Sequence, residues 1–230
     1  MKTVSGSSLP TDSYEHKPGG PDCKADGNSL PNALHLRGMK TPTLLETHLD
    51  EAAELLGRIR SDASFLTSAA RGAEILSTAL ARGGKAISCG NGGSMCDAIH
   101  FAEELSGRYR NHRKGLAAIA CSDPAHLTCV GNDYGFEHVF ARFVEALGRP
   151  GDVLVAITTS GNSANVVAAA HAAKAMGMQV VGLTGNSGGA LASLCDAEVR
   201  VPWTGYADRI QEVHIKVIHS WIDAVEQAVA

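Results

Sequence analysis

The chain has 230 residues, of which 44% are hydrophobic and 19% are charged, and its formal net charge is -4. This composition excludes a wholly disordered chain, because a sequence of this size and apolar content can bury a substantial core. The slight negative charge excludes a nucleic-acid binder that acts through a basic surface. The sequence also lacks a run of about eighteen apolar residues that would predict a membrane-spanning helix.

The first residues and the cysteines together indicate a cytoplasmic protein. The N-terminal residues lack the apolar stretch of a secretory signal peptide. No two of the six cysteines form a C-x-x-C pair, which favours free thiols in a reducing compartment over a disulfide framework or a zinc knuckle. The cysteines are Cys23, Cys89, Cys96, Cys121, Cys129 and Cys195.

The predicted structure begins after a polar tail. Residues 1–38 contain four of the eight prolines and no sustained apolar period, so we expect a disordered tail followed by one domain over 39–230. Thr43 and Glu46 match a capping box, which predicts the start of a first helix. A second helix is predicted over 62–82, and it ends at Gly83 and Gly84.

Short apolar runs then alternate with helical stretches, which is typical of βαβ units and a mostly parallel sheet. The strands are predicted at 85–89, 116–121, 152–158, 179–184 and 198–201, and the helices at 95–109, 137–147, 164–176 and 207–229. The predicted fold class is therefore α/β, a three-layer, doubly wound, five-stranded sheet preceded by a helical hairpin.

Three of these strands end in small polar loops, where an open α/β sheet binds its ligands. The loops are GNGGS at 90–94, TTSGNS at 158–163 and GNSGG at 185–189. The second loop places four hydroxyl groups before a helix, whose free N–H groups attract an anion. Ordinary turns are the alternative. The nucleotide motifs G-x-x-x-x-G-K-[ST] and G-x-G-x-x-G are missing, so a sugar phosphate is the favoured ligand.

Two helices carry candidate metal ligands or acid–base groups. His100 and Glu104 form an i,i+4 pair on the helix that follows the first loop, although such pairs are also common on solvated faces. Gln211 and His219 lie on one stripe of the last helix, about 12 Å apart along its axis. Both would have to extend toward one ion to join a zinc site with the first pair. His214 lies off this stripe, and we interpret it as a packed or surface residue.

Five motifs in order resemble the phosphoheptose isomerase (sedoheptulose-7-phosphate isomerase) family, which has the sugar-isomerase (SIS) fold. They are CGNGGS at 89–94, DAIHFAEEL at 97–105, GND at 131–133, TSGNS at 159–163 and RIQEVH at 209–214. The resemblance covers residues 39–230. Thr158 stands where the family often has Ser, a change that keeps the hydroxyl, and Met95 stands where His or Ala is common.

The resemblance implies an aldose–ketose isomerisation of sedoheptulose 7-phosphate to D-glycero-D-manno-heptose 7-phosphate, for bacterial heptose and lipopolysaccharide biosynthesis. It also implies a homotetramer with active sites between subunits. One zinc ion per subunit would bind at the positions of His100, Glu104, Gln211 and His219. The implied substrate contacts are Asn91, Gly92, Gly93, Glu104, Asn132, Asp133, Thr158, Thr159, Ser160, Ser163 and Gln211. From residue type and resemblance we assign Glu104 as the base and His219 as its acid–base partner.

Two other functions remain as alternatives. Some SIS-fold relatives are non-catalytic modules that bind a replication initiator protein or sense a sugar phosphate. Because Glu104 and His219 are both present, the enzyme is favoured over such a module. Another enzyme of the same fold, acting on a hexose or pentose phosphate, is the nearer alternative. Neither a nucleic acid nor a membrane is expected as a partner.

Overall fold

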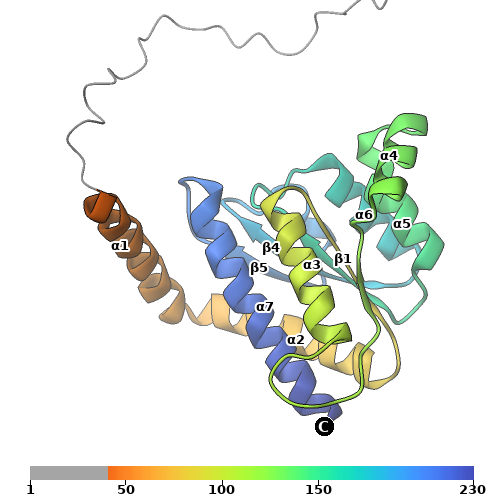
Figure 1. Cartoon of the computed structure of the whole chain (residues 1–230), viewed down its shortest axis with the longest axis horizontal. Helices are drawn as coiled ribbons and strands as arrows, with labels where there is room; N and C mark the ends of the chain where they lie inside the picture. The colour runs from red at the N-terminus through yellow and green to blue at the C-terminus, as the bar shows by residue number, and fades with distance from the viewer. Residues whose placement is uncertain (1–40) are drawn as a thin grey trace, which may run out of the picture. The chain divides into compact units, whose positions relative to one another are not determined.

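Five parallel strands form the centre of the fold, and the computed structural model describes residues 41–230 around them (Figure 1). The strands are β1 (Ala86–Gly90), β2 (Ala118–Ala120), β3 (Val153–Ile157), β4 (Gln179–Gly185) and β5 (Ala197–Val201). Their order in the sheet is β2-β1-β3-β4-β5, and every neighbouring pair is parallel. The chain therefore reverses its direction of travel across the sheet between β1 and β3, which predicts a ligand crevice at the carboxyl ends of these two strands.

Seven α-helices belong to the described residues. They are α1 (Thr41–Arg60), α2 (Ala63–Ala81), α3 (Gly93–Ser106), α4 (Pro124–Asp133), α5 (Val139–Leu147), α6 (Ala164–Ala175) and α7 (Ala207–Val229). Short 3-10 turns occur at Phe136–His138 and Ala192–Leu194. Between Thr41 and Ala230, every helix is too short or too polar to span a lipid bilayer.

The three central strands, β1, β3 and β4, are buried on both faces of the sheet, which explains why they read as nearly continuous apolar runs. Along β3, Val153, Val155 and Ile157 pack into a core with α2, α3 and α7. The alternate residues Leu154 and Ala156 pack into a second core with α4, α5 and α6. The three-layer, doubly wound, parallel sheet predicted from the sequence is confirmed.

Several local predictions need correction. Helix α1 begins at Thr41, so Thr43 lies inside the helix and does not cap it. Helix α4 was missed, although Asp123 caps its first turn through the His126 N–H and Pro124 occupies the first helical position, where its missing N–H costs nothing. Helix α3 ends at Ser106, before the predicted 109, because the chain turns at Gly107.

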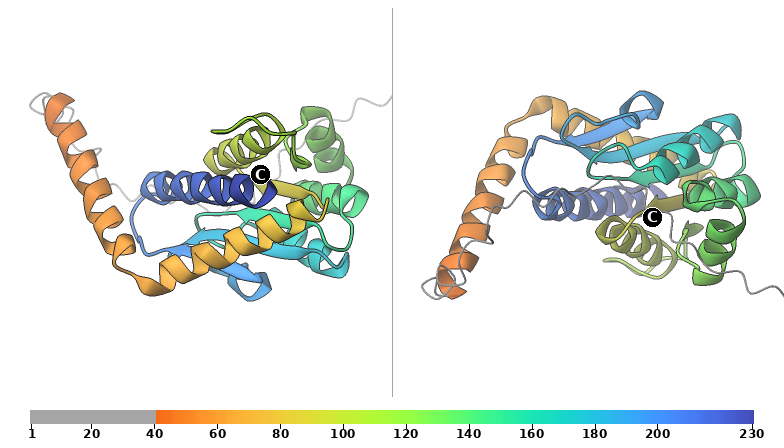
Figure 2. Two further views of the ribbon diagram at one scale, coloured as in Figure 1. Left: turned by 90° about the horizontal axis from the view of Figure 1, so that it is seen from below. Right: turned by 90° about the horizontal axis from the view of Figure 1, so that it is seen from above.

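The first two helices do not form the expected hairpin. From Leu45 onward α1 runs away from α2 and does not lie back along it (Figure 2). Helix α2 packs against α7 and β5. The physical reason is that the buried face of α2, including Phe65, Ile75 and Leu76, is already covered by the sheet layer and α7. The predicted tail over 1–38 lies outside the described residues, as does Cys23, and the other five cysteines are free.

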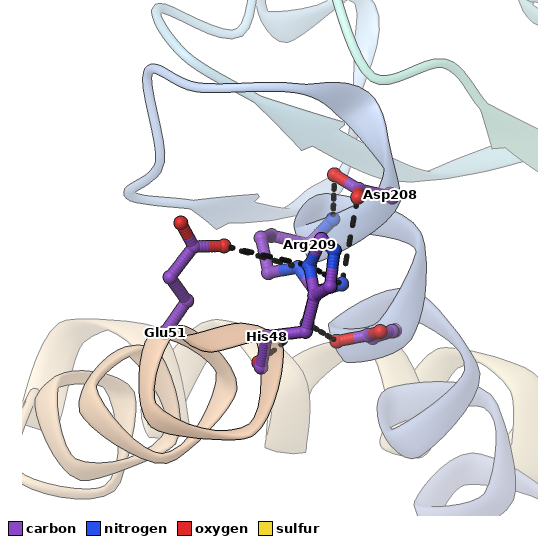
Figure 3. Close-up of polar contacts among 5 residues, drawn as sticks. His48, Glu51, Asp208 and Arg209 are labelled. Carbon is purple, nitrogen blue, oxygen red and sulfur yellow. Dashed lines mark hydrogen bonds and ion pairs between the residues drawn. The ribbon is translucent and has the colours of Figure 1, made fainter. Parts of the chain in front are cut away.

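One buried arginine connects α1 to the start of α7 (Figure 3). Nη1 of Arg209 donates to the backbone carbonyl of His48 at 3.0 Å and to the Glu212 carboxylate at 2.8 Å. Glu51 and Asp208 supply further carboxylate oxygens at 3.8 and 3.4 Å. Three carboxylates therefore surround one cation. These contacts fix the start of α7, two residues before Gln211.

Helix α2 approaches α7 closely because Gly72 faces the indole of Trp221. Trp221 is fully buried, and its Nε1 donates to the Ala69 carbonyl at 2.8 Å, so the ring has little room to move. A Cβ on Gly72 would lie 2.7 Å from the Trp221 ring. Only glycine allows the two helices to pack at this separation.

We expect Gly72→Ala to lower the free energy of unfolding by about 1–3 kcal/mol, since an extra methyl group in a packed core forces its neighbours from their preferred positions. Gly57→Ala is the matched control, because a Cβ at this exposed position of α1 meets no atom within 4 Å. Its helix propensity should raise the free energy of unfolding by up to about 1 kcal/mol. Urea unfolding at one protein concentration measures both, and equal effects would contradict the packing argument.

Candidate active site

The loops after β1 and β3 meet at the point where the strand order reverses. The side-chain hydroxyl of Thr158 hydrogen-bonds with that of Ser163 at 2.9 Å and with that of Ser160 at 3.4 Å. Thr158 is buried and Ser160 is exposed, so the hydroxyl cluster extends from the sheet edge to the surface. Helix α6 starts directly after Ser163. This cluster of hydroxyls and a helix N-terminus suits an anion such as a phosphate monoester.

A reciprocal pair of amides ties these two loops together. Asn91 donates to the carboxamide oxygen of Asn165 at 2.9 Å, and Asn165 donates back to Asn91 at the same distance. The side chain of Asn91 therefore connects the glycine loop to the first turn of α6. Sequence reasoning missed Asn165, and the one available signal was a polar residue of low helix propensity in the apolar first half of α6.

The third predicted loop, 185–189, supports the hydroxyl loop. A Cβ on Gly161 would overlap the carbonyl of Gly188, and Gly161 has a φ of +71°, a conformation that favours glycine. The backbone carbonyl of Gly161 accepts from the Leu191 N–H at 3.0 Å, and the Asn162 side chain accepts from the Ala190 N–H at 3.0 Å. These contacts hold the hydroxyl cluster in one position at the sheet edge.

Helices α3 and α7 lie side by side and run in the same direction (Figure 1). Near their starts, a Cβ on Gly93 would lie 2.6 Å from the carboxamide of Gln211. Two turns further along, the rings of His100 and His219 are in contact, with centroids 5.2 Å apart. The parallel packing thus sets the predicted pair on α3 opposite the predicted stripe on α7.

Three of the four predicted metal ligands form one cluster. The Nε2 atoms of His100 and His219 lie 3.3 Å apart. Glu104 completes the triangle, with Oε1 at 3.2 Å from His100 Nε2 and Oε2 at 3.8 Å from His219 Nε2. All three side chains are half-buried. Two ring nitrogens this close either share one hydrogen or direct their lone pairs at a common cation.

The distances within this cluster fit a zinc ion. Ligand atoms at zinc-bond lengths in a tetrahedron are about 3.3 Å apart. Two of the separations, 3.3 Å between the histidine nitrogens and 3.2 Å from His100 Nε2 to Glu104 Oε1, are close to this value, and the third, from His219 Nε2 to Glu104 Oε2, is 3.8 Å. Glu104 Oε2 is also buried without a hydrogen-bond partner among the described residues, so it can accept a cation or a proton. Gln211 places its carboxamide on Gly93, so it would have to extend along α7 to become the fourth ligand.

Two neighbouring side chains shape the cluster further. Tyr109 stacks on the His219 ring, with centroids 5.7 Å apart and an angle of 23° between the planes. Asp97 lies one turn before His100 on α3. Burial raises the pKa of Asp97 to about 6, although the nearby His100 acts in the opposite direction. A half-buried carboxyl and two histidines therefore share this face of α3 and α7.

Asn132 and Asp133 lie apart from this cluster in the hydrogen-bond network. They end α4, are exposed, and hydrogen-bond to each other at 2.7 Å. Within residues 41–230, neither side chain is bonded to a residue of the two loops or to the cluster of His100, Glu104 and His219, which we call the triad. Their predicted contact with a substrate therefore stays a prediction.

The comparisons with known proteins show the family of the chain. Residues 47–185 match the SIS domain model. The phosphoheptose isomerase of Pectobacterium atrosepticum is 57% identical over 187 residues, which cover 81% of this chain and 97% of that protein. The chain belongs to the phosphoheptose isomerase family of SIS-domain proteins.

Solved structures of the family have the same fold as this chain. The phosphoheptose isomerase of Neisseria gonorrhoeae is 40% identical and superposes with a TM-score of 0.75 over 82% of this chain and 100% of that one. The enzyme of Francisella tularensis is 36% identical, with a TM-score of 0.77 and the same coverage. The SIS domain match ends at Gly185, so it includes His100 and Glu104 but not His219.

His214 is packed in the interior, as one of the two interpretations predicted. It is fully buried, and its Nε2 donates to the Thr184 carbonyl at 3.0 Å, while Nδ1 has no partner among the described residues. Burial lowers the pKa of His214 from 6.5 to about 4, and the bond to Thr184 opposes this only in part. The residue is therefore neutral in the folded protein.

The free energy of unfolding should consequently fall as the pH drops below 6.5, because the unfolded chain binds a proton at His214 that the folded chain refuses until about pH 4. Between pH 7 and 4.5 this one group contributes a loss of about 2–3 kcal/mol. His214→Gln removes the titration and should flatten this part of the stability profile. His171→Gln, at an exposed position of α6, is the control. An unchanged pH profile in His214→Gln would contradict the assignment.

Proposed function

We propose that the chain is an aldose–ketose isomerase that converts sedoheptulose 7-phosphate to D-glycero-D-manno-heptose 7-phosphate. The observation that carries the proposal is the Glu104 carboxylate, 3.8 Å from the His219 ring nitrogen, on the helix that starts at the glycine loop. The hydroxyl cluster of the neighbouring loop supports a phosphate ester as the anchoring group. The curated relatives named phosphoheptose isomerase support this sugar over a hexose or pentose phosphate.

The substrate binds in two parts in this proposal. The hydroxyls of Thr158, Thr159, Ser160 and Ser163, together with the N-terminus of α6, hold the phosphate. The sugar end contacts the remaining predicted residues, which are Asn91, Gly92, Gly93, Glu104, Asn132, Asp133 and Gln211. Because Asn91 already bonds to Asn165, its carboxamide is held rigidly and offers the sugar a fixed partner.

Glu104 and His219 move the protons. Glu104 takes a proton from C1 of the ketose while His219 gives one to the C2 oxygen, which forms the enediol. Glu104 then returns its proton to C2 while His219 takes the proton of the C1 hydroxyl, which leaves the carbonyl at C1 and both residues in their starting states. No atom is gained or lost overall. A positioned acid–base pair of this kind contributes about 10²–10⁴-fold to the rate.

The first test is an isomerase assay in deuterated water. After incubation with sedoheptulose 7-phosphate, NMR should show a new heptose 7-phosphate with deuterium at C2, although efficient internal return of the proton reduces the label. Glu104→Gln should lower turnover by about 10²-fold or more, since it removes the base. Glu103→Gln, at the exposed neighbouring position, should remain near wild type.

Two results would overturn this function. Near-wild-type turnover of Glu104→Gln would refute the assignment of the base. If the wild-type chain gives neither product nor deuterium exchange, with or without added zinc, the non-catalytic SIS module or an enzyme for another sugar takes its place. Substrate tests with hexose and pentose phosphates distinguish these two.

One zinc ion per subunit is part of the proposal, held by His100, Glu104 and His219, with Gln211 as the fourth ligand. When bound, zinc polarises sugar oxygens as a Lewis acid. The support is the donor set and the closeness of two of its separations to those of a tetrahedral site.

Zinc binding can be measured directly, by competition with a chromophoric chelator. The wild-type chain should bind one ion. His100→Ala removes a ligand, so it should weaken binding by more than the roughly 10–100-fold that loss of a supporting residue costs. His171→Ala should bind like wild type. Equal affinity of His100→Ala and wild type would exclude this site.

The remaining properties follow from the family and from surface features. We place the enzyme in the cytoplasm, in heptose biosynthesis for lipopolysaccharide, with residues 39–230 as its SIS domain. A homotetramer with active sites between subunits would cover the exposed apolar side chains of α1, including Leu45 and Leu49, which are 59% exposed. It would also provide a route for Asn132 and Asp133 of one subunit to reach the site of another.

A further inference from the structure

The segment that leaves α3, residues 107–113, reaches back to both helices of the site. Arg113, at its end, is buried and donates through Nη2 to the carbonyl of Glu104 at 2.6 Å and through Nη1 to that of Leu105 at 2.7 Å. These two carbonyls lie in the last turn of α3, where a helix has unpaired acceptors and the negative end of its dipole. The guanidinium therefore holds the backbone of the residue that we assign as the base.

The same guanidinium binds α7. Nε of Arg113 donates to Oε1 of Glu226 at 3.0 Å, and the two side chains are only 8% and 2% exposed. Oε2 of Glu226 accepts from the backbone N–H groups of Arg110 and Asn111, each at 3.2 Å. Although burial acts to raise the pKa of Glu226, these donors and Arg113 hold it below its ordinary value. The carboxylate is thus charged and connects α7 to the segment from both of its oxygens.

A second residue of the segment contacts the site itself. Tyr109 stacks on the ring of His219, which lies on α7 two turns before Glu226. The segment therefore contacts the backbone of the assigned base on α3 and the ring of its partner on α7. The residues to which Arg113 bonds on α3 and on α7 are far apart in the sequence. Its planar guanidinium joins them, because it has donors on two sides.

We propose that Arg113 and Glu226 form a positioning clamp, which sets the separation of α3 and α7 and hence of Glu104 and His219. This inference rests on the proposed isomerase function. Arg113 bonds to Glu104 through the backbone carbonyl, and Glu226 bonds to Arg113 and to the segment, so both residues act through the helices that they join. A change of about 1 Å in the spacing of an acid–base pair can lower the rate by about 10²-fold.

The chain contains a matched control for this clamp. Arg110 and Asp223 form an ion pair between the same segment and the same helix, at 2.8 Å. Their side chains are 63% and 31% exposed, so water and salt screen the pair. Asp223→Asn removes one charge from α7, as Glu226→Gln does, but leaves the buried link intact.

The experiment compares Glu226→Gln, Arg113→Met and the double variant Arg113→Met/Glu226→Gln with Asp223→Asn and wild type. The double variant is included in case Arg113→Met alone fails to fold. It leaves no unpaired buried charge, and the side-chain oxygen of its introduced Gln still accepts hydrogen bonds from the segment, so it gives the same readouts. Each variant is assayed for kcat, for KM with sedoheptulose 7-phosphate and for zinc affinity, well below its unfolding temperature.

We expect the clamp variants, including the double variant, to lose about tenfold to a hundredfold in kcat while KM stays near wild type, because the phosphate loop is untouched. Zinc affinity should weaken by about 10–100-fold. Asp223→Asn should match wild type in all three. A folded double variant with wild-type kcat and zinc affinity would overturn the clamp, and so would equal losses in Asp223→Asn. An inactive wild-type chain refutes the proposed function instead, and the relative zinc affinities then still decide on the clamp.

Discussion

The parallel packing of α3 against α7 is the constraint on which the candidate site depends. Each helix alone carries an incomplete set of groups, His100 and Glu104 on one and His219 on the other. Because the helices run in the same direction, the start of α3 meets the start of α7 at Gly93 and Gln211, and the histidines meet two turns later. A shift of one turn would move the ring nitrogens apart by about 5 Å and dissolve the cluster. The Arg113–Glu226 pair near the end of α7 opposes such a shift, because Arg113 also bonds to the last turn of α3.

The sheet topology explains why the two halves of the site lie together. The reversal of strand order between β1 and β3 predicts a ligand crevice at the carboxyl ends of these strands. One side of it receives the hydroxyl loop, which has neutral donors and a helix N-terminus, and the other receives the start of α3. An anionic group is therefore favoured at the end of the crevice that holds the hydroxyl loop. The carboxylate of Glu104 lies on the neighbouring helix, away from that end. The proposed function requires such a separation, since the substrate would present its phosphate to the loop and its carbonyl to the cluster of His100, Glu104 and His219.

The features that were predictable from the sequence are those with a local pattern. The alternation of apolar runs and helices predicted the sheet, and spacing on one helix face predicted His100 with Glu104 and Gln211 with His219. The contacts that hold these groups have no such pattern. Asn165 is 74 residues from Asn91, and Glu226 is 113 residues from Arg113, so only the folded chain shows that they pair. The missing hairpin has a similar origin, because sequence adjacency does not tell whether α2 buries its apolar face on α1 or on α7.

In the proposed function, Glu104 acts both as a metal ligand and as a base, and the geometry of its carboxylate is compatible with both roles. A carboxylate has two oxygens, and here they differ in surroundings. Oε1 lies 3.2 Å from His100, while Oε2 lies 3.8 Å from His219 and is buried without a hydrogen-bond partner among the described residues. A buried oxygen without a donor has no hydrogen bond to give up when another group approaches it. One oxygen can therefore contribute to the cation site while the other receives the proton of the sugar, provided that α3 and α7 keep their spacing.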